Sequence, residues 1–169
     1  MRITALAGLP GTGKSSLARA LARQSGAVVL DKDRMREALF PGQVDASREQ
    51  DQLATRAIHA CVEALAESGM AHVVLDGRTY TRQTDVEELT QLAQRCGARL
   101  EWIECVCAPD VARARISRDA RDGVHPAPNR TPELYDELRA RAEELRVPRL
   151  VVDTTRAGAD ELARILCQP

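Results

Sequence analysis

The stretch G-L-P-G-T-G-K-S, residues Gly8–Ser15, decides the fold class. It matches the phosphate-binding loop pattern G-x-x-x-x-G-K-[ST] at every fixed position. Residues 2–7 before it form a short apolar run typical of a strand, and apolar residues after it recur at helical spacing. A strand, a glycine-rich turn and a helix are the setting that this loop requires. The sequence therefore predicts that nucleotide phosphates bind at the start of the first helix.

The loop itself supplies most of the predicted phosphate contacts. Free N–H groups and the positive end of the helix dipole attract phosphate, and the Lys14 ammonium can reach the β and γ phosphates. The chain has only two lysines and 22 arginines, so a lysine at position 14 calls for a reason. The reason is that a planar guanidinium fits such a loop poorly. The Ser15 hydroxyl is the expected ligand of Mg²⁺. The expected nucleotide contacts in this region are Gly8, Pro10, Gly11, Thr12, Gly13, Lys14, Ser15 and Ser16.

The rest of the chain alternates predicted strands and helices. Strands are expected at 27–30, 72–75, 99–106 and 150–152. Helices are expected at 33–39 and 111–121. Two more helices should follow capping boxes, one formed by Ser47 with Gln50 and the other by Thr84 with Glu87. A further helix should start at Thr131 and Pro132. This alternation predicts an α/β fold: a five-stranded parallel sheet covered by helices on both faces. Ligands should bind at the carboxyl ends of the strands, and residues 1–169 should form a single domain.

Composition and charge narrow the class of protein. The formal net charge is −1 and the sequence pI is about 6.3, so there is no global basic field to hold a long nucleic-acid duplex. No apolar run approaches 18 residues and no signal-peptide pattern is present, so we expect a cytoplasmic protein without a membrane segment. The five cysteines include no C-x-x-C pair and are expected to be core thiols. His59, His72 and His125 are expected at the surface.

A polar segment at residues 31–36 follows the second predicted strand and should lie within reach of a γ-phosphate. Asp33 is the better candidate to orient or deprotonate an acceptor hydroxyl. Arg36, one turn later on the same helical face, can pair with a substrate anion. Lys32 would add positive potential. A solvated helix start with the same charges is the alternative interpretation.

The third predicted strand ends in V-V-L-D-G, and Asp76 emerges from it as a candidate second ligand of Mg²⁺. Four apolar residues followed by Asp form a weak motif, because any strand that leads into a turn looks similar. The residues that come next could form the wall that recognises the acceptor: Gly77, Arg78, Thr79, Tyr80 and Arg82, with Arg78 and Tyr80 as the candidate acceptor contacts. Tyr80 either stacks on a ring-shaped acceptor or lies half-buried at the surface.

Four arginines, Arg113, Arg115, Arg118 and Arg121, share one predicted helix that runs into the segment 122–130. Residues 113–130 would form a lid that closes over ATP, excludes water and places Arg118 or Arg121 against the transferring phosphoryl group. Arg113 is expected to contact the nucleotide. Gly123 could act as a hinge, and Pro126 and Pro128 would stiffen the flap. A solvent-facing helix in an arginine-rich protein is the alternative.

These features, in this order and over nearly the whole chain, resemble the small P-loop kinases that include polynucleotide 5′-kinase, adenylylsulfate kinase and chloramphenicol phosphotransferase. The segment K-D-R-M-R, residues 32–36, resembles the R-D-x-x-R element of polynucleotide kinases. That likeness implies that Asp33 is the base and that Arg36 contacts a substrate phosphate. Asp31, Asp33 and Arg36 are also similar to the D-G-D-x-x-R element of adenylylsulfate kinases, without its middle glycine.

Other positions extend the resemblance. Asp76 corresponds to the Asp of the D-T-N turn in polynucleotide kinases, although Gly77 and Arg78 replace the residues that follow it. Arg118 and Arg121 resemble the lid arginines. The D-T-T segment at 153–155 is similar to the end of the fifth strand in these families, which implies that Thr155 lies near the purine.

The resemblance implies a P-loop NTPase fold and a soluble kinase that uses ATP or GTP with Mg²⁺. Such a kinase would transfer the γ-phosphoryl group to a hydroxyl of a small molecule, a nucleoside or an antibiotic, as in antibiotic resistance. Near-neutral charge and four aromatic residues disfavour single-stranded nucleic acid as a partner without excluding it. A polynucleotide or RNA 5′-hydroxyl kinase and a non-catalytic nucleotide-binding switch remain the alternatives. The sequence leaves the oligomeric state open.

Overall fold

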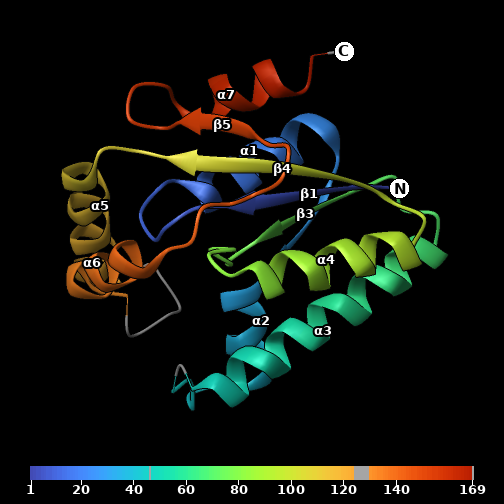
Figure 1. Cartoon of the computed structure of the whole chain (residues 1–169), viewed down its shortest axis with the longest axis horizontal. Helices are drawn as coiled ribbons and strands as arrows, with labels where there is room; N and C mark the ends of the chain where they lie inside the picture. Colours follow the sequence, from blue (N-terminus) through green and yellow to red (C-terminus); the bar gives the residue numbers. More distant parts are fainter. Residues whose placement is uncertain (46, 124–129, 169) are drawn as a thin grey trace.

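A computed structural model describes residues 1–45, 47–123 and 130–168, which form an α/β fold (Figure 1). Within these residues the strands form a single five-stranded sheet, and every pairing in it is parallel. The strand order is β2-β3-β1-β4-β5. The strands are β1 (Arg2–Ala7), β2 (Val28–Asp31), β3 (His72–Asp76), β4 (Arg99–Val106) and β5 (Leu150–Asp153). The predicted parallel sheet is therefore confirmed.

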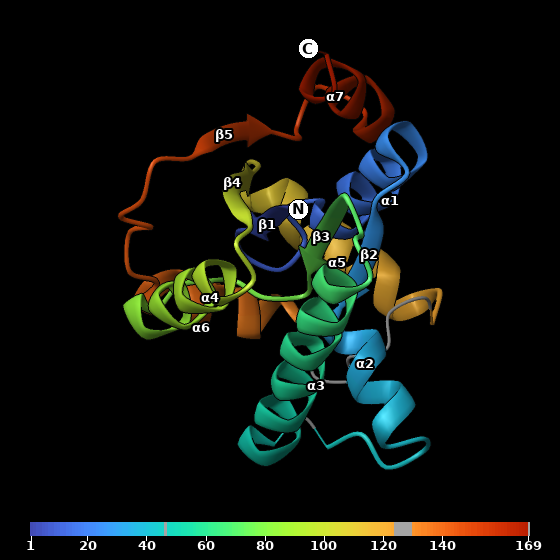
Figure 2. The same ribbon diagram turned by 90° about the vertical axis from the view of Figure 1, so that its right-hand side faces the viewer.

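Helices cover both faces of this sheet, as predicted. Helices α1 and α7 pack together on one face, and α3 and α4 lie on the other (Figures 1 and 2). The strand arrowheads point toward α5 and α6 (Figure 1). The helices are α1 (Lys14–Ser25), α2 (Lys32–Leu39), α3 (Arg48–Glu67), α4 (Gln83–Arg95), α5 (Pro109–Arg121), α6 (Pro132–Arg141) and α7 (Ala159–Leu166). None of the helices in the described residues is long and apolar enough to cross a membrane.

Side chains of the central strands alternate between two apolar clusters. On β1, Ile3 and Ala5 face the cluster under α3 and α4, whereas Leu6 faces the cluster under α1 and α7. On β4, Trp102 faces the cluster under α3 and α4, and Ile103 faces the cluster under α1 and α7. A parallel sheet buried on both faces needs such continuous apolar strands. The two clusters fix the sheet, and with it the positions of the polar residues at its carboxyl edge.

Several helix boundaries differ from the prediction. The capping box at Thr84 and Glu87 is wrong: α4 begins at Gln83 and has no side-chain cap. The Gln83 N–H instead donates to the Glu143 carboxylate at 3.3 Å, which satisfies one free N–H group of the helix start. Helix α5 begins two residues early, at Pro109, whose ring suits the first helical position. Helix α7 was not predicted.

The box at Ser47 and Gln50 is half confirmed. The Ser47 hydroxyl accepts a hydrogen bond from the Gln50 N–H at 3.2 Å and caps α3. The Gln50 side chain does not return to Ser47. It bonds the backbone of Asp45 and Gln43, so it ties the preceding loop to the helix.

His72 was expected at the surface and is buried at the start of β3. Its Nε2 lies 2.9 Å from the Thr4 hydroxyl, and its Nδ1 lies 2.9 Å from the Ser25 hydroxyl. Burial, aided by the nearby Arg2 guanidinium, lowers the pKa of His72 to about 4. The surface prediction is wrong because packing across the sheet, which the local sequence does not specify, covers this residue. His59 is half-buried, and His125 lies outside the described residues.

Candidate active site

The phosphate loop joins β1 to α1 and has little room for side chains. Gly8 and Gly11 have φ angles of 129° and 77°, in the region that favours glycine. A Cβ on Gly8 would lie 2.3 Å from the Cys105 carbonyl oxygen, and one on Gly11 would lie 2.6 Å from that of Ala112. The loop therefore packs directly on the end of β4 and on α5, and its shape is set by backbone contacts.

Lys14 begins α1, and its ammonium lies inside the curve of this loop. Its Nζ donates to the carbonyl oxygens of Gly8 at 2.7 Å and Leu9 at 2.9 Å. Burial lowers the pKa of Lys14, and the neighbouring Asp76 carboxylate opposes that shift. A buried cation held by two carbonyls is well placed to exchange part of this coordination for phosphate oxygens.

Asp76, at the end of β3, is 3% exposed, and its Oδ1 has no hydrogen-bond partner among the described residues. A buried carboxylate oxygen without a partner is costly unless a ligand satisfies it. Asp76 and Ser15 line the same cleft, and both offer the oxygen ligands that Mg²⁺ prefers. No group of three or more His, Cys, Asp or Glu side chains that could hold a metal occurs in the described part of the chain. The residues thus fit a Mg²⁺ ion that is held jointly with nucleotide phosphates.

Arg115 of α5 contacts the phosphate loop, a contact that the sequence did not predict. Arg115 donates to the Gly11 carbonyl at 3.3 Å and to the Thr154 hydroxyl and carbonyl at 2.9 and 2.8 Å. The Thr154 hydroxyl donates in turn to the Thr12 carbonyl at 2.9 Å. Arg115 and Thr154 therefore tie α5 and the end of β5 to the loop.

The two predicted nucleotide contacts beside these residues lie elsewhere. Arg113 points away and pairs with Asp136 at 2.6 Å, because residues two apart lie on nearly opposite sides of a helix. The Thr155 hydroxyl accepts a hydrogen bond from the Ala108 N–H at 3.1 Å. Neither residue lines the cleft.

Across the cleft, α2 presents the predicted acceptor residues. The Asp31 carboxylate caps this helix by accepting from the backbone N–H groups of Asp33 and Arg34 at 2.9 and 3.3 Å. The cap fixes the first turn, so Asp33 and Arg36 share one face, and Arg36 Nη1 lies 3.4 Å from Asp33 Oδ1. Both residues line the cleft. The structure therefore brings Asp33 and Arg36 together on the cleft wall.

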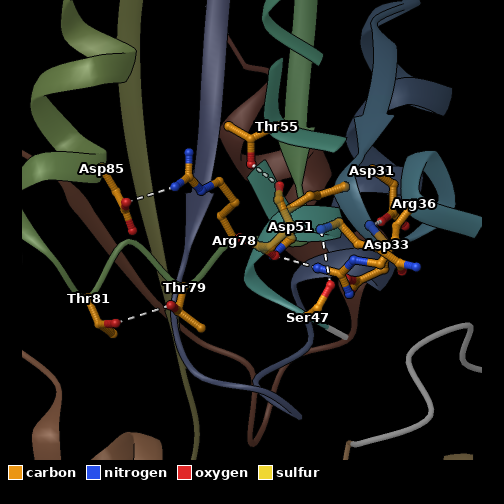
Figure 3. A network of polar contacts seen from close by, with 12 residues as sticks. Asp31, Asp33, Arg36, Ser47, Asp51, Thr55, Arg78, Thr79, Thr81 and Asp85 are labelled. Carbon is orange, nitrogen blue, oxygen red and sulfur yellow. Dashed lines mark hydrogen bonds and ion pairs between the residues drawn. The ribbon is translucent and has the colours of Figure 1, made fainter. Parts of the chain in front are cut away.

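Asp51 of α3 completes this wall and was missed by the sequence reasoning. Its Oδ1 accepts hydrogen bonds from both Lys32 and Arg36, which joins α2 to α3 (Figure 3). Partial burial of Asp51 opposes ionisation, yet the two cations hold the pKa of this carboxyl below its usual range. An acidic residue in the first turn of a helix is so common that its sequence position gives no signal of this role.

One cleft of about 930 Å³ connects the phosphate loop to this wall. The predicted site residues that line it are Pro10, Gly11, Gly13, Lys14, Ser15, Ser16, Asp33, Arg36, Asp76 and Arg118. Gly8 and Thr12 do not line it and belong to the loop backbone behind it. The predicted residues that lie away from it are Arg78, Tyr80, Arg113, Arg121 and Thr155.

Neither Arg78, which is partly buried, nor Tyr80, which is buried, lines the cleft. Tyr80 is 4% exposed and packs edge-on against Trp102, with ring centroids 4.9 Å apart. Arg78 lies over the Tyr80 ring and donates to Asp85 at 2.7 Å, away from the Asp33 and Arg36 pair (Figure 3). The sequence could not show that the chain turns inward after β3. The other residues expected in this wall, Gly77, Thr79 and Arg82, do line the cleft.

The predicted lid is described only at its two ends. Arg118 lines the cleft, and Arg121 does not. Arg130 donates to Asp119 at 3.0 Å, which joins the end of this segment back to α5, and both residues line the cleft. Pro126 and Pro128 lie outside the described residues.

Comparisons with known proteins agree with this geometry. A family described as an AAA domain matches residues 3–145. No curated protein matches. The structure is similar to that of a candidate kinase from Chloroflexus aurantiacus, with a TM-score of 0.79, 23% identity and coverage of 98% of this chain and 96% of that one.

Two further structures contain named ligands. APS kinase of Mycobacterium tuberculosis, in complex with AMPPNP and APS, has a TM-score of 0.69 and 21% identity, with coverage of 98% and 94%. Shikimate kinase of Acinetobacter baumannii, in complex with shikimate, has a TM-score of 0.60 and 19% identity, with coverage of 99% and 92%. At these identities the likeness establishes the P-loop fold that the chain shares with these kinases.

Proposed function

The chain belongs to the AAA domain family, and from this premise we propose that it is a kinase that transfers the γ-phosphoryl group of ATP or GTP to a hydroxyl of a small molecule. The observation that carries the proposal is that one cleft holds both Lys14 of the phosphate loop and Asp33 of the opposite wall. A nucleotide-binding switch needs only the first of these. A phosphoryl transferase needs both, since the acceptor must be held in line with the γ-phosphate.

In this proposal the residues divide the work of transfer. The loop N–H groups and Lys14 hold the phosphates, and Ser15 and Asp76 would hold Mg²⁺, which neutralises phosphate charge when bound. The acceptor oxygen forms a bond to the γ-phosphorus while the bond to the β–γ bridging oxygen breaks, and Asp33 takes the hydroxyl proton. We assign the neutralisation of the transferred group to Arg118 rather than Arg121, because Arg118 lines the cleft.

Residues 113–130 act as the lid in this scheme. Arg118 and Asp119 belong to α5, and the ion pair between Asp119 and Arg130 couples the far end of the segment to that helix. Closure would exclude water, which otherwise competes with the acceptor for the γ-phosphoryl group. We propose, as the sequence indicates, that residues 1–169 act as one domain in the cytoplasm.

A small acceptor is favoured over single-stranded nucleic acid. Among the described residues, no aromatic side chain lines the cleft, so there is no platform on which successive bases could stack. Nucleosides and antibiotics remain candidate acceptors. APS and shikimate, which occupy related structures, are further candidates.

The test is a search for an acceptor. Purified protein is incubated with ATP and Mg²⁺ and with nucleosides, APS, shikimate, aminocyclitol and nucleoside antibiotics, or a 5′-hydroxyl oligonucleotide, and products are detected by mass. We expect one small molecule to gain a single phosphate and Asp33→Asn to abolish that gain. ATP binding without transfer to any acceptor would contradict the proposal and favour the switch. Selective phosphorylation of the oligonucleotide would identify the polynucleotide kinase instead.

A further inference from the structure

Strand β5 lies at one edge of the sheet, and no described strand pairs with its outer side (Figure 2). Leu150 and Val151 are 51% and 53% exposed, and the described strands have no other exposed large apolar side chain. The opposite edge differs, because β2 is half-buried along its whole length. Natural sheet edges are usually protected by a charged side chain, a proline or a bulge. Residues 150–152 contain none of these, so this edge is apolar and unprotected.

The free backbone groups of this edge belong to alternate residues. The Thr154 N–H donates to the Val106 carbonyl of β4 at 2.9 Å. Backbone groups along a strand alternate between its two sides, so those of Val152 also face β4. The N–H and C=O groups of Val151 and Asp153 therefore face outward. Each of these two residues offers one donor and one acceptor to a further strand.

The exposed side chains lie on both faces of the edge. Val152 packs in the cluster under α1 and α7, so Leu150, two residues earlier, faces the same side. Val151 faces the opposite side, that of α3 and α4. A strand added at this edge would bond the outward backbone groups and cover apolar surface on both faces. The edge is therefore suited to an extended strand that is itself apolar.

We propose that a second copy of this chain supplies that strand, and that β5 pairs antiparallel with its own copy across a two-fold axis at Val151. The outward backbone groups of the two Val151 residues then bond each other. Arg149, which Glu104 holds on this face, comes opposite Asp153 of the second copy, so unlike charges meet at both ends of the pairing. A shift by one residue would set outward-facing groups against groups that already face β4. Two-fold dimers of this kind are the commonest protein assemblies.

The pairing leaves the candidate active site open. Residues 150–153 do not line the described cleft. Antiparallel pairing also turns the carboxyl ends of the two β5 strands, and with them the two clefts, to opposite ends of the joined sheet. Thr154 follows β5 directly and donates to the Thr12 carbonyl of the phosphate loop at 2.9 Å. The dimer would thus hold, in each copy, the strand that leads into the support of the loop.

Sedimentation equilibrium of the full chain tests the dimer. We expect wild type to dimerise and Val151→Lys to raise the dissociation constant at least about tenfold, because two ammonium groups would lie directly opposite each other. Leu53→Lys is the matched control, since Leu53 is also an exposed apolar residue but belongs to α3. A monomeric wild type, or equal weakening in Leu53→Lys, would overturn the proposal.

A mixture of two variants separates loss of the interface from loss of the fold. Val151→Glu alone should be as poor a dimer as Val151→Lys, because like charges again face each other. An equimolar mixture of the two should form a heterodimer, since unlike charges then lie opposite each other. Unfolded variants could not give this result. Absence of the heterodimer would overturn the pairing at Val151.

Cysteine cross-linking tests the register. In the proposed pairing the two Cα atoms at position 151 lie about 5.5 Å apart, within the range of a disulfide. The two at position 150 are out of line by two residues and lie roughly 8 Å apart, beyond that range. With oxidised glutathione, Val151→Cys should give a 151–151 linked peptide by mass and Leu150→Cys no 150–150 peptide. Equal cross-linking of the two variants, or none in Val151→Cys, would overturn the proposal.

Discussion

The phosphate loop is held by hydrogen bonds to backbone carbonyls, whereas the acceptor wall across the cleft is held by ion pairs between side chains of two helices. In the loop, Arg115 and Thr154 bond the carbonyls of Gly11 and Thr12. In the wall, the single carboxylate of Asp51 holds both Lys32 and Arg36. The loop thus offers the backbone of one contiguous motif, which side chains remote in sequence support, whereas the wall offers charged side chains of two helices.

Because of this difference, the phosphate loop and the acceptor wall give different information about function. Backbone contacts in the loop bind the phosphates that all nucleoside triphosphates share. Side-chain charges in the wall define the ligand that fits there, and they can vary without loss of the fold. The loop indicates the donor, and only the wall can indicate the acceptor.

The largest effect should come from Lys14→Ala, which removes the ammonium of the phosphate loop. Turnover should fall by roughly 100-fold or more, because the ammonium that stabilises the transferring phosphate is lost. Steady-state kinetics with varied ATP would measure it. Lys32→Ala, at the other lysine, is the matched comparison and should raise the KM for the acceptor while leaving ATP affinity within twofold. Similar kinetics for the two variants would remove the distinction between the halves.

Thr154→Val tests the support behind the loop. The hydroxyl is buried and is bonded to Arg115 and Thr12, so its loss should reduce the free energy of unfolding by about 1–3 kcal/mol. ATP affinity should weaken severalfold, because the loop loses a contact. Urea unfolding and nucleotide titration would measure both effects. Thr155→Val, at the exposed neighbouring residue, is the control, and an equal loss there would contradict the account.

Asp51→Asn removes the carboxylate that joins α2 to α3 in the acceptor wall. Without the carboxylate, Lys32 and Arg36 lose their shared partner, and Arg36 can turn toward Asp33. We expect the acceptor KM to rise about tenfold, roughly the value of one charge-assisted hydrogen bond, with ATP affinity retained. Asp136→Asn, which breaks the ion pair with Arg113 outside the cleft, should leave kinetics unchanged. A fall in ATP affinity in Asp51→Asn would show that the halves are not independent.

The smallest effect concerns His72, far from both halves at the opposite end of β3. Its pKa is about 4 in the folded protein, below the usual 6.5, so the unfolded chain takes up a proton first as the pH falls. The free energy of unfolding should therefore decrease from pH 6.5 to 4. We expect about 1 kcal/mol from this residue, since it lines a hollow of about 330 Å³ that water can screen.

His72→Gln should flatten that part of the pH profile, as measured by urea unfolding at successive pH values. Nucleotide affinity should not change at neutral pH, because the histidine is already neutral there. An unchanged slope in His72→Gln would contradict its burial in the neutral form.

Local sequence predicted the parts of the fold whose causes are local. The bounds of β1, the start of α1 after the glycine loop and the full extent of β4 are as predicted, since strand periodicity and the glycine loop are each set by adjacent residues. The start of α4 was wrong because Glu143, 60 positions away, supplies its N-terminal contact. Tertiary contacts of this kind have no signature in a single sequence.

The site divides in the same way. The phosphate-loop motif predicted the loop, the end of the third strand predicted Asp76, and the residues after β2 predicted Asp33 and Arg36, all of which line one cleft. Spacing alone could not set the rotation of α5, so it could not indicate that Arg115 contacts the loop and that Arg113 lies outside the cleft. The inward turn after β3, which buries Tyr80, had no signal either.

The most direct test of the central claim is a paired measurement on Asp33→Asn: ATP affinity by calorimetry and the rate of phosphoryl transfer to the acceptor found in the search. The account predicts that ATP affinity stays within twofold of wild type, because the loop half is intact. It also predicts that transfer slows by at least about 100-fold, because the residue that takes the hydroxyl proton is lost. Undiminished transfer, or a loss of ATP affinity as large as the loss of transfer, would contradict it.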